Sequence, residues 1–174
     1  MAKSFKFKNN NYVDSTGIVH NKTLLSTLLD KLLNVVPTKY LLATISDSSH
    51  VSNVDWTKML LIKSEGNVKN TELTVENNVI KVGKNISRLK ISASVFCEGI
   101  VNGAYIWGAI CVNDSRACMT ITSGTYYQSA IFPPKIINVQ ENDLISLQLN
   151  TSSSSNVSER LGVINTWLLV EIIE

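Results

Sequence analysis

The residues best suited to chemistry in this sequence are few and scattered. Its two histidines, His20 and His50, lie thirty positions apart, and neither has a second histidine or a cysteine at metal-ligand spacing. Three cysteines, Cys97, Cys111 and Cys118, are odd in number, and each lies within or beside an apolar stretch. Because cysteine often packs as a small hydrophobe, we expect three buried free thiols. The sequence predicts no metal site and no cofactor.

Sequence motifs of common enzymes are also missing. The eight glycines form no Gly-x-Ser-x-Gly elbow, phosphate-binding loop or dinucleotide fingerprint. Four aspartates fall at expected turns or strand ends, where this residue usually accepts backbone hydrogen bonds: Asp47, Asp55, Asp114 and Asp143. A glycosidase needs two carboxylates at a set separation in a groove, and sequence alone does not exclude such a pair. We therefore expect no catalytic residues and no enzyme, with glycan hydrolysis as the least favoured alternative.

Aromatic and polar residues on loops are the remaining candidates for chemistry. Tyr126 and Tyr127 follow a Ser-Gly-Thr turn, and Asp114 and Arg116 lie between two expected strands. Rigid β-domains carry recognition on such loops. Aromatic rings that stack on sugars, together with polar hydrogen-bonding groups, would suit a cell-surface glycan, so these four residues are candidate receptor contacts. The alternative is that the two tyrosines cap the core.

The composition predicts the kind of domain that must position these residues. The chain has 174 residues, of which 17% are charged, and it contains 20 Ser, 13 Thr and 18 Asn. Its 17 Ile and 17 Val against 7 Ala favour strands over helices. No apolar run approaches the roughly 18 residues of a membrane span, and the basic start has no apolar stretch behind it. We expect one mainly β domain with a short appendage, without membrane insertion and without a nucleic-acid partner.

The appendage contains a helix signal. Between residues 24 and 36 apolar residues recur at helical spacing, and Pro37 ends the pattern. A helix this short is marginal alone, and its apolar stripe is wide. It could pack on its own domain, dock on another protein or form a trimeric neck, and we favour the neck. The helix residues expected to contact other copies are Leu25, Leu28, Leu29, Leu32 and Val36.

From residue 39 onward, strand signals alternate with turn residues. The expected strands cover residues 40–45, 56–63, 72–75, 79–82, 88–98, 105–112, 119–122, 129–132, 135–139, 144–150 and 164–173. Asn77-Asn78 and Asn102-Gly103 resemble two-residue hairpin turns. Strands with one apolar face, in this number, indicate an antiparallel sandwich or barrel.

The last expected strand departs from this alternation. Both of its faces are apolar between residues 167 and 173, apart from Glu171. A sandwich covers only one face of each sheet, so something else must cover the second face. In a chain with no spare domain, another copy of the chain is the simplest cover. We therefore expect Trp167 and Leu169 to lie in a contact between copies.

Four stretches together resemble the jelly-roll head of the complement-C1q and tumour-necrosis-factor type, as used in bacteriophage fibres. They are residues 85–95, 105–113, 139–149 and 167–173. In that family a turn ending in Gly-Asp precedes the penultimate strand, and here Asn142 takes the place of the glycine. Residues 8–22, followed by the leucine-rich helix, are similar to the neck and attachment segment of phage fibre proteins.

The resemblance implies a homotrimeric antiparallel jelly-roll sandwich preceded by a short N-terminal helix. Residues 1–22 would attach to capsid or tail proteins of a virion, residues 23–38 would form the neck, and residues 39–174 would form the head. The implied protein is a head- or tail-fibre or decoration protein, made in the cytoplasm of a bacterial host and displaying its head for host adhesion. The alternative is a free bacterial lectin-like or signalling module of the same fold.

Overall fold

The chain forms two compact units, Met1–Pro37 and Thr38–Glu174. The computed structural model describes residues 6–8, 11–13, 19–21, 38–45, 50–124, 126–153, 157–159 and 166–173. Each unit is considered by itself below.

The first unit contains a three-stranded antiparallel sheet that the sequence did not predict. Its strands β1 (Lys6–Lys8), β2 (Asn11–Val13) and β3 (Val19–Asn21) pair in chain order. The expected helix over residues 24–36, with Leu25, Leu28, Leu29, Leu32 and Val36, lies outside the described residues. Its part in a neck therefore stays a prediction.

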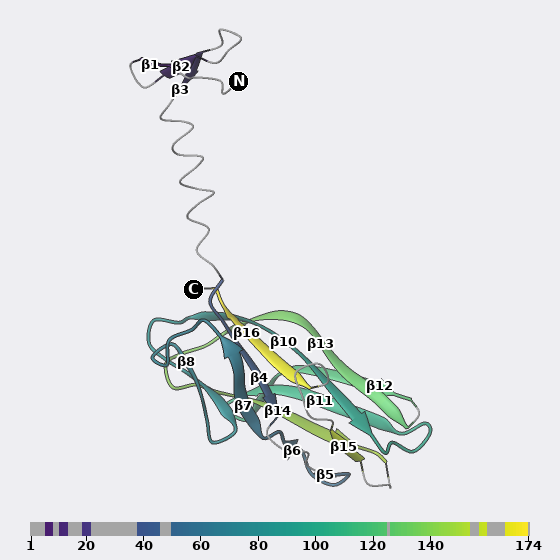
Figure 1. Cartoon of the computed structure of the whole chain (residues 1–174). Helices are drawn as coiled ribbons and strands as arrows, with labels where there is room; N and C mark the ends of the chain where they lie inside the picture. Colours follow the sequence, from purple (N-terminus) through teal and green to yellow (C-terminus); the bar gives the residue numbers. More distant parts are fainter. Residues whose placement is uncertain are drawn as a thin grey trace. The chain divides into compact units, whose positions relative to one another are not determined.

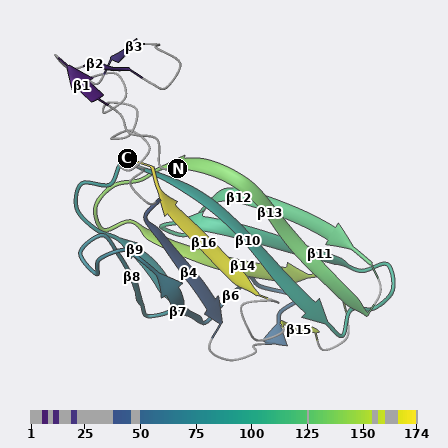
Figure 2. The ribbon, with the colours of Figure 1, turned by 45° about the horizontal axis from the view of Figure 1, so that its top comes forward.

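The second unit is a sandwich of two antiparallel sheets (Figures 1 and 2). The first sheet has the order β5 (His50–Val51), β15 (Val157–Glu159), β10 (Arg88–Glu98), β16 (Trp167–Ile172), β4 (Tyr40–Ile45) and β7 (Leu61–Gly66), and β13 (Tyr127–Asn138) pairs with β10. The second sheet has the order β12 (Ser115–Ser123), β11 (Tyr105–Val112), β14 (Leu144–Thr151), β9 (Val79–Val82) and β8 (Leu73–Glu76), and β6 (Thr57–Lys58) pairs with β14. The predicted mainly β antiparallel sandwich is confirmed.

The central strand β10 shows why the sequence pattern predicted this fold. Leu89, Ile91, Ala93, Val95 and Cys97 alternate along it, and all five are fully buried between the sheets. β10 pairs with β13 on one side and with β16 and β15 on the other, so it organises the whole first sheet. The bounds predicted for β4, β9, β10 and β11 agree with the structure.

Two tight hairpins depend on residues that tolerate left-handed backbone. Asn77 and Asn78 join β8 to β9 with φ of 50° and 64°, as predicted from the sequence. Asn113 and Asp114 join β11 to β12 in the same way, with φ of 50° and 62°. Positive φ at both central residues matches the twist of paired strands, and asparagine and aspartate adopt it more readily than most residues.

The interpretation of Asn102-Gly103 as a hairpin was wrong. The two residues do form a turn, in which the Ala104 N–H donates to the Val101 carbonyl at 2.9 Å. However, that turn connects β10 in the first sheet to β11 in the second. A local turn signal does not say whether the strands on either side pair with each other.

The single strand expected over residues 56–63 was also wrong, because the chain changes sheets there. β6 pairs with β14 in the second sheet, whereas β7 pairs with β4 in the first. Between them Met59 is fully buried, and its N–H donates to the Leu147 carbonyl at 2.8 Å. A continuous polar-apolar pattern does not reveal such a crossing.

Two strands predicted on either side of Pro133-Pro134 are one strand in the structure. β13 runs through both prolines, and the β10–β13 register shifts between Ile91 and Ala93 where they lie opposite. Within the described residues β13 pairs with no other strand, so it is an edge strand of the first sheet. Edge strands and bulges are the places where a sheet tolerates the missing N–H of proline.

Phe132 fills the core between the two sheets next to β11. Its side chain is 1% exposed, and it fits because residue 108 is glycine: a Cβ atom there would lie 2.4 Å from the Phe132 Cζ atom. The Phe132 ring can therefore occupy this position only because residue 108 has no side chain.

We predict that Phe132→Ala lowers the free energy of unfolding by about 3–5 kcal/mol, because it leaves a cavity in the core. Val54 is 81% exposed and far from Phe132 in the sequence, so Val54→Ala is a control that should cost less than about 1 kcal/mol. Urea denaturation followed by circular dichroism measures both. Equal losses for the two variants would contradict this account of the core.

Candidate recognition surfaces

The outward face of the first sheet is apolar over its centre. Directly opposed residues on paired strands share a face, and two outward rows are Ile62–Thr44–Trp167–Ser94–Ile131 and Leu42–Leu169–Ser92. We name Leu42, Ile62, Trp167 and Leu169 the Trp167 face. Leu42, Trp167 and Leu169 are half-buried and Ile62 is 43% exposed. The two sequence-predicted contact residues Trp167 and Leu169 thus lie together on the surface of this sheet.

A polar row borders the Trp167 face. Lys90 forms an ion pair with Glu171 on the paired strand, with 2.7 Å between Nζ and Oε2. Next to it, the Tyr40 hydroxyl donates to Glu65 Oε1 at 2.6 Å. That hydrogen bond, with some burial, raises the pKa of Tyr40 above its ordinary value. The face therefore has an apolar centre and a hydrogen-bonded polar rim, as many protein interfaces do.

A second apolar surface lies at the edge formed by β12 and β13. Met119, Ile121 and Ile131 are 51%, 56% and 62% exposed there, and we name these three residues the β12–β13 edge. A hollow of about 510 Å³ at this edge is lined by Phe96, Thr120, Ile121, Thr122, Tyr127, Gln128, Ser129 and Ile131. Residues this apolar and this exposed, gathered at one edge, are typical of interaction sites.

Tyr126 and Tyr127 lie at one end of this edge. Their rings contact each other edge to face, with centroids 4.8 Å apart, and Tyr127 also stacks on Phe96 at 5.9 Å. The two side chains are 56% and 51% exposed, so neither is part of the buried core. About half of each side chain is in contact with solvent.

Asp114 and Arg116 lie at the opposite end of β12. Asp114 forms an ion pair with Lys58 at 3.1 Å and accepts a hydrogen bond from Gln148 at 3.2 Å, whereas Arg116 stacks over the Trp56 ring at 4.3 Å. β12 has nine residues, so its ends are about 30 Å apart. The structure therefore does not bring the four sequence-predicted receptor contacts into one site.

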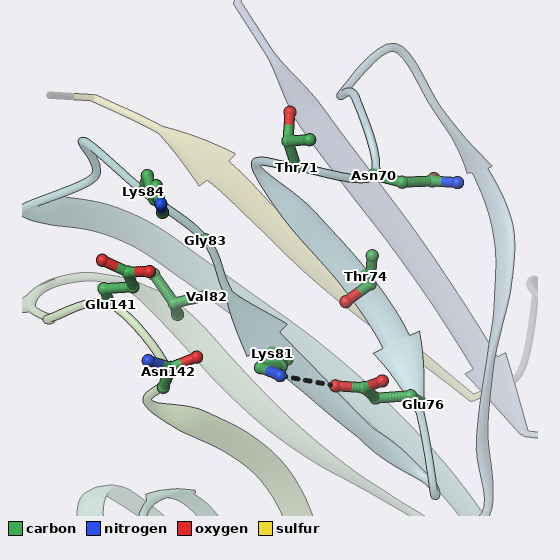
Figure 3. Close-up of a pocket in the computed structure, with 10 residues that line it drawn as sticks. All are labelled: Asn70, Thr71, Thr74, Glu76, Lys81, Val82, Gly83, Lys84, Glu141 and Asn142. Carbon is green, nitrogen blue, oxygen red and sulfur yellow. Dashed lines mark ion pairs between the residues drawn. The ribbon is translucent and has the colours of Figure 1, made fainter.

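A polar hollow of about 480 Å³ lies against the second sheet (Figure 3). Three segments line it: residues 70–76, which lead into β8 and include it, residues 81–84 at the end of β9, and the turn before β14. The lining residues are Asn70, Thr71, Thr74, Glu76, Lys81, Val82, Gly83, Lys84, Glu141 and Asn142. We name this site the polar hollow. Sequence reasoning missed it, because only Asn142 was noted there, as a turn residue.

Backbone hydrogen bonds tie the three segments of the polar hollow together. Val82 donates to the Asp143 carbonyl at 2.9 Å, and Asn142 donates back to the Val82 carbonyl at 2.8 Å. On the other side Gly83 donates to the Glu72 carbonyl at 2.7 Å. A Cβ atom at position 83 would lie 1.9 Å from the Thr71 carbonyl oxygen, so only glycine allows this approach. The walls are therefore fixed by the fold.

Glu72 secures the segment that carries Asn70 and Thr71. Its carboxylate accepts a hydrogen bond from the Lys39 ammonium and another from the Lys69 N–H, the latter at 2.9 Å. The Lys39 contact, followed by the Lys69 N–H, lowers the pKa of Glu72 below its ordinary value.

All three cysteines are free, and Cys97 and Cys111 are buried, as predicted. The expected burial of Cys118 was wrong: it is half-buried, because it lies on β12 at the end of the second sheet. Burial raises the pKa of the Cys111 thiol. Across the described ranges, no group of three or more histidine, cysteine, aspartate or glutamate side chains could hold a metal ion. The same residues include no helix long and apolar enough to cross a membrane.

No protein-family model and no curated protein sequence matches this chain. Solved structures do match the sandwich. Murine APRIL at pH 5.0 superposes with a TM-score of 0.61 at 11% identity, over 78% of this chain and 99% of that one. Eiger TNF from S. frugiperda superposes with a TM-score of 0.56 at 8% identity, over 79% of this chain and 94% of that one. The head is a TNF-like jelly roll. We use the name jelly-roll head for residues 38–174 below.

We predict that Glu72→Gln destabilises the jelly-roll head at neutral pH and that the difference disappears in acid. A carboxyl group with a lowered pKa stabilises the fold above its unfolded pKa of about 4.3, and that contribution is lost as the pH falls through the folded pKa. Urea midpoints of wild type and variant, measured from pH 7 down to below about 4, should converge. Glu76→Gln, in the exposed Lys81 ion pair, is the control. An equal Glu72→Gln deficit at both ends of this pH range would contradict the assignment.

Proposed function

We propose that the jelly-roll head is a recognition module without catalytic activity that assembles with two other copies of itself into a ring. The observation that carries this proposal is the presence of two different apolar surfaces, the Trp167 face and the β12–β13 edge, on one small unit. The sequence contains none of the common catalytic motifs, which favours binding over catalysis.

Two different surfaces favour a ring over a simple dimer. A twofold dimer joins one patch to the same patch on its partner, whereas a ring joins one patch to a different patch on the next copy. The Trp167 face lies on β4, β7 and β16, and the β12–β13 edge lies beyond β10 from it. Ile131 of that edge shares an outward row with Trp167, and the polar Ser94 on β10 lies between them. In the proposed ring, the edge of each copy packs on the Trp167 face of the next. The number three follows from the family that the sequence resembles.

In this proposal, residues at the two ends of β12 contact the recognised partner. Asp114 and Arg116 lie at one end of β12, with Lys58 and Trp56 holding them in place. Tyr126 and Tyr127 lie at the other end, close to the proposed contact between copies. Either end would be repeated around the ring, so weak single contacts would add through avidity. This role is shared by the lectin-like and signalling forms of the module.

The experiment uses two lysine variants and their mixture. Leu169→Lys places a charge on the Trp167 face, and Ile121→Lys places one on the β12–β13 edge. Each alone should dissociate the ring into folded single chains, because a charge at a desolvated apolar contact is costly. Mixed in equal amounts, they should form a heterodimer, since the intact edge of the first fits the intact face of the second.

Val54→Lys is the matched control, because Val54 is 81% exposed and lies outside both surfaces. It should assemble as wild type does. Sedimentation velocity measures the masses, and circular dichroism confirms that every variant is folded. If neither variant changes the wild-type mass, or if the mixture contains only single chains, the face-to-edge ring is wrong.

A second form of the proposal adds attachment to a virion through residues 1–22. It is favoured by the first unit, which is compact on its own and carries the β1–β2–β3 sheet, separate from the jelly-roll head. In this form the protein is a phage head- or tail-fibre or decoration protein, made in a bacterial cytoplasm, whose head contacts the host surface. The free module has no such attachment.

We predict that deleting residues 1–22 leaves assembly of the head intact and abolishes incorporation into particles. The head keeps its own core, whereas the attachment segment is lost. Gradient-purified particles probed for the tagged full-length and truncated chains measure this. Equal amounts of both chains with the particles, or of neither, would favour the free module.

A further inference from the structure

We propose that the polar hollow binds an uncharged sugar residue, as part of a glycan. The proposal rests on the recognition role given to the jelly-roll head, but not on its assembly into a ring. The site is separate from Tyr126 and Tyr127 and from both apolar surfaces, since its residues lie on or next to β8 and β9 and in the turn before β14.

The size and rigidity of the polar hollow suit a small ligand. Its volume of about 480 Å³ lies in the range of about 300–1,000 Å³ typical of ligand sites. Val82 and Gly83 are tied by backbone hydrogen bonds to Asn142 and Asp143 on one side and to Glu72 on the other. A ligand would therefore meet a backbone frame that is already in place, which lowers the entropic cost of binding.

The lining offers hydrogen bonds that the fold does not use. Lys81 and Glu76 form an ion pair at 3.3 Å along one wall (Figure 3). No hydrogen bond or ion pair to another described residue is made by the six remaining polar side chains, Asn70, Thr71, Thr74, Lys84, Glu141 and Asn142. They come from all three segments and are drawn around one space in Figure 3.

These groups match a sugar better than other small ligands. Amides and hydroxyls both donate and accept, carboxylates accept and ammonium groups donate, so the set can serve a ring that carries several hydroxyls. Two lysines and two glutamates give the lining no net charge. A phosphate or carboxylate ligand would face Glu76 and Glu141, and a divalent cation would face Lys81 and Lys84. An uncharged polyhydroxylated ring avoids both conflicts.

The test titrates the full chain, labelled with ¹⁵N, with single sugars and follows the amide shifts of Gly83, Lys84 and Asn142. The neutral probes are glucose, galactose, mannose, rhamnose, N-acetylglucosamine and N-acetylgalactosamine, and the charged counterparts are glucuronate and glucose 6-phosphate. We expect at least one neutral sugar to bind, shifting these amides in a saturable way, and to bind more tightly than its charged counterparts.

Two variants locate the binding. Asn142 has a φ of 70°, so Asn142→Gly removes the amide and keeps the turn. Glu141→Gln replaces a charged hydrogen-bond acceptor by a neutral one and keeps the shape. Asn142→Gly should weaken sugar binding about tenfold, as expected when one hydrogen bond to the ligand is lost. Glu141→Gln should weaken it by less, because the amide oxygen still accepts a hydrogen bond but carries no charge. Asn77→Gly is the matched control, because Asn77 also has a positive φ, of 50°, and lies outside the polar hollow.

Failure of this proposal is distinct from failure of the ring. Sedimentation of the same samples reports assembly independently of the sugar titration. The sugar proposal is overturned if no neutral sugar shifts the three amides, if a charged counterpart binds more tightly, or if Asn142→Gly and Glu141→Gln bind as the Asn77→Gly control does. A trimer that binds no sugar would overturn the sugar proposal and support the ring. A single chain that binds sugar would overturn the ring and support the sugar proposal.

Discussion

A two-layer sandwich buries one face of each sheet and leaves the other face outside. The assembly and recognition properties of this head depend on whether another surface covers those outward faces. Between the layers, the alternating residues of β10 and the close approach of Phe132 to Gly108 make one shared core. Outside, the first sheet still presents Trp167 and Leu169, because its last strand carries apolar residues on both sides. Exposed apolar area on a rigid sheet is stabilised when another surface covers it. In our account, that need drives assembly.

The same constraint decides which surfaces serve assembly and which serve ligand binding. If copies cover the Trp167 face and the β12–β13 edge, the polar ends of the sandwich are left for ligands. At those ends the chain uses asparagine, aspartate and glycine to make tight turns, and the same residue types offer hydrogen-bonding groups to solvent. The polar hollow is the place where three such segments meet, held by the backbone of Val82 and Gly83. Folding and recognition thus use the same turn residues.

Much of the fold was predictable because it depends on patterns among residues that are close in the sequence. The alternation along β10 and the Asn77-Asn78 turn depend on neighbours in sequence, and both were predicted correctly.

The errors in the predicted fold arose where the structure depends on residues that are distant in the sequence. Nothing local shows that the chain changes sheets at Met59, or that β13 can pass through Pro133 because it is an edge strand. The polar hollow was missed for the same reason, since Thr74, Lys84 and Asn142 belong to segments that only the folded sheet brings together. The outward position of Trp167 and Leu169 was predictable because two-sided apolarity is visible in one strand, and their contact with another copy stays a prediction.

The mass of the wild-type chain in solution tests the central claim most directly. Sedimentation equilibrium over a range of micromolar concentrations should give a folded species with three times the chain mass of 19.2 kDa. That mass should be stable to dilution, because two different apolar surfaces on each copy are covered at once. A folded species of 19.2 kDa throughout that range would contradict the account, since the Trp167 face would then be stable in water without a partner.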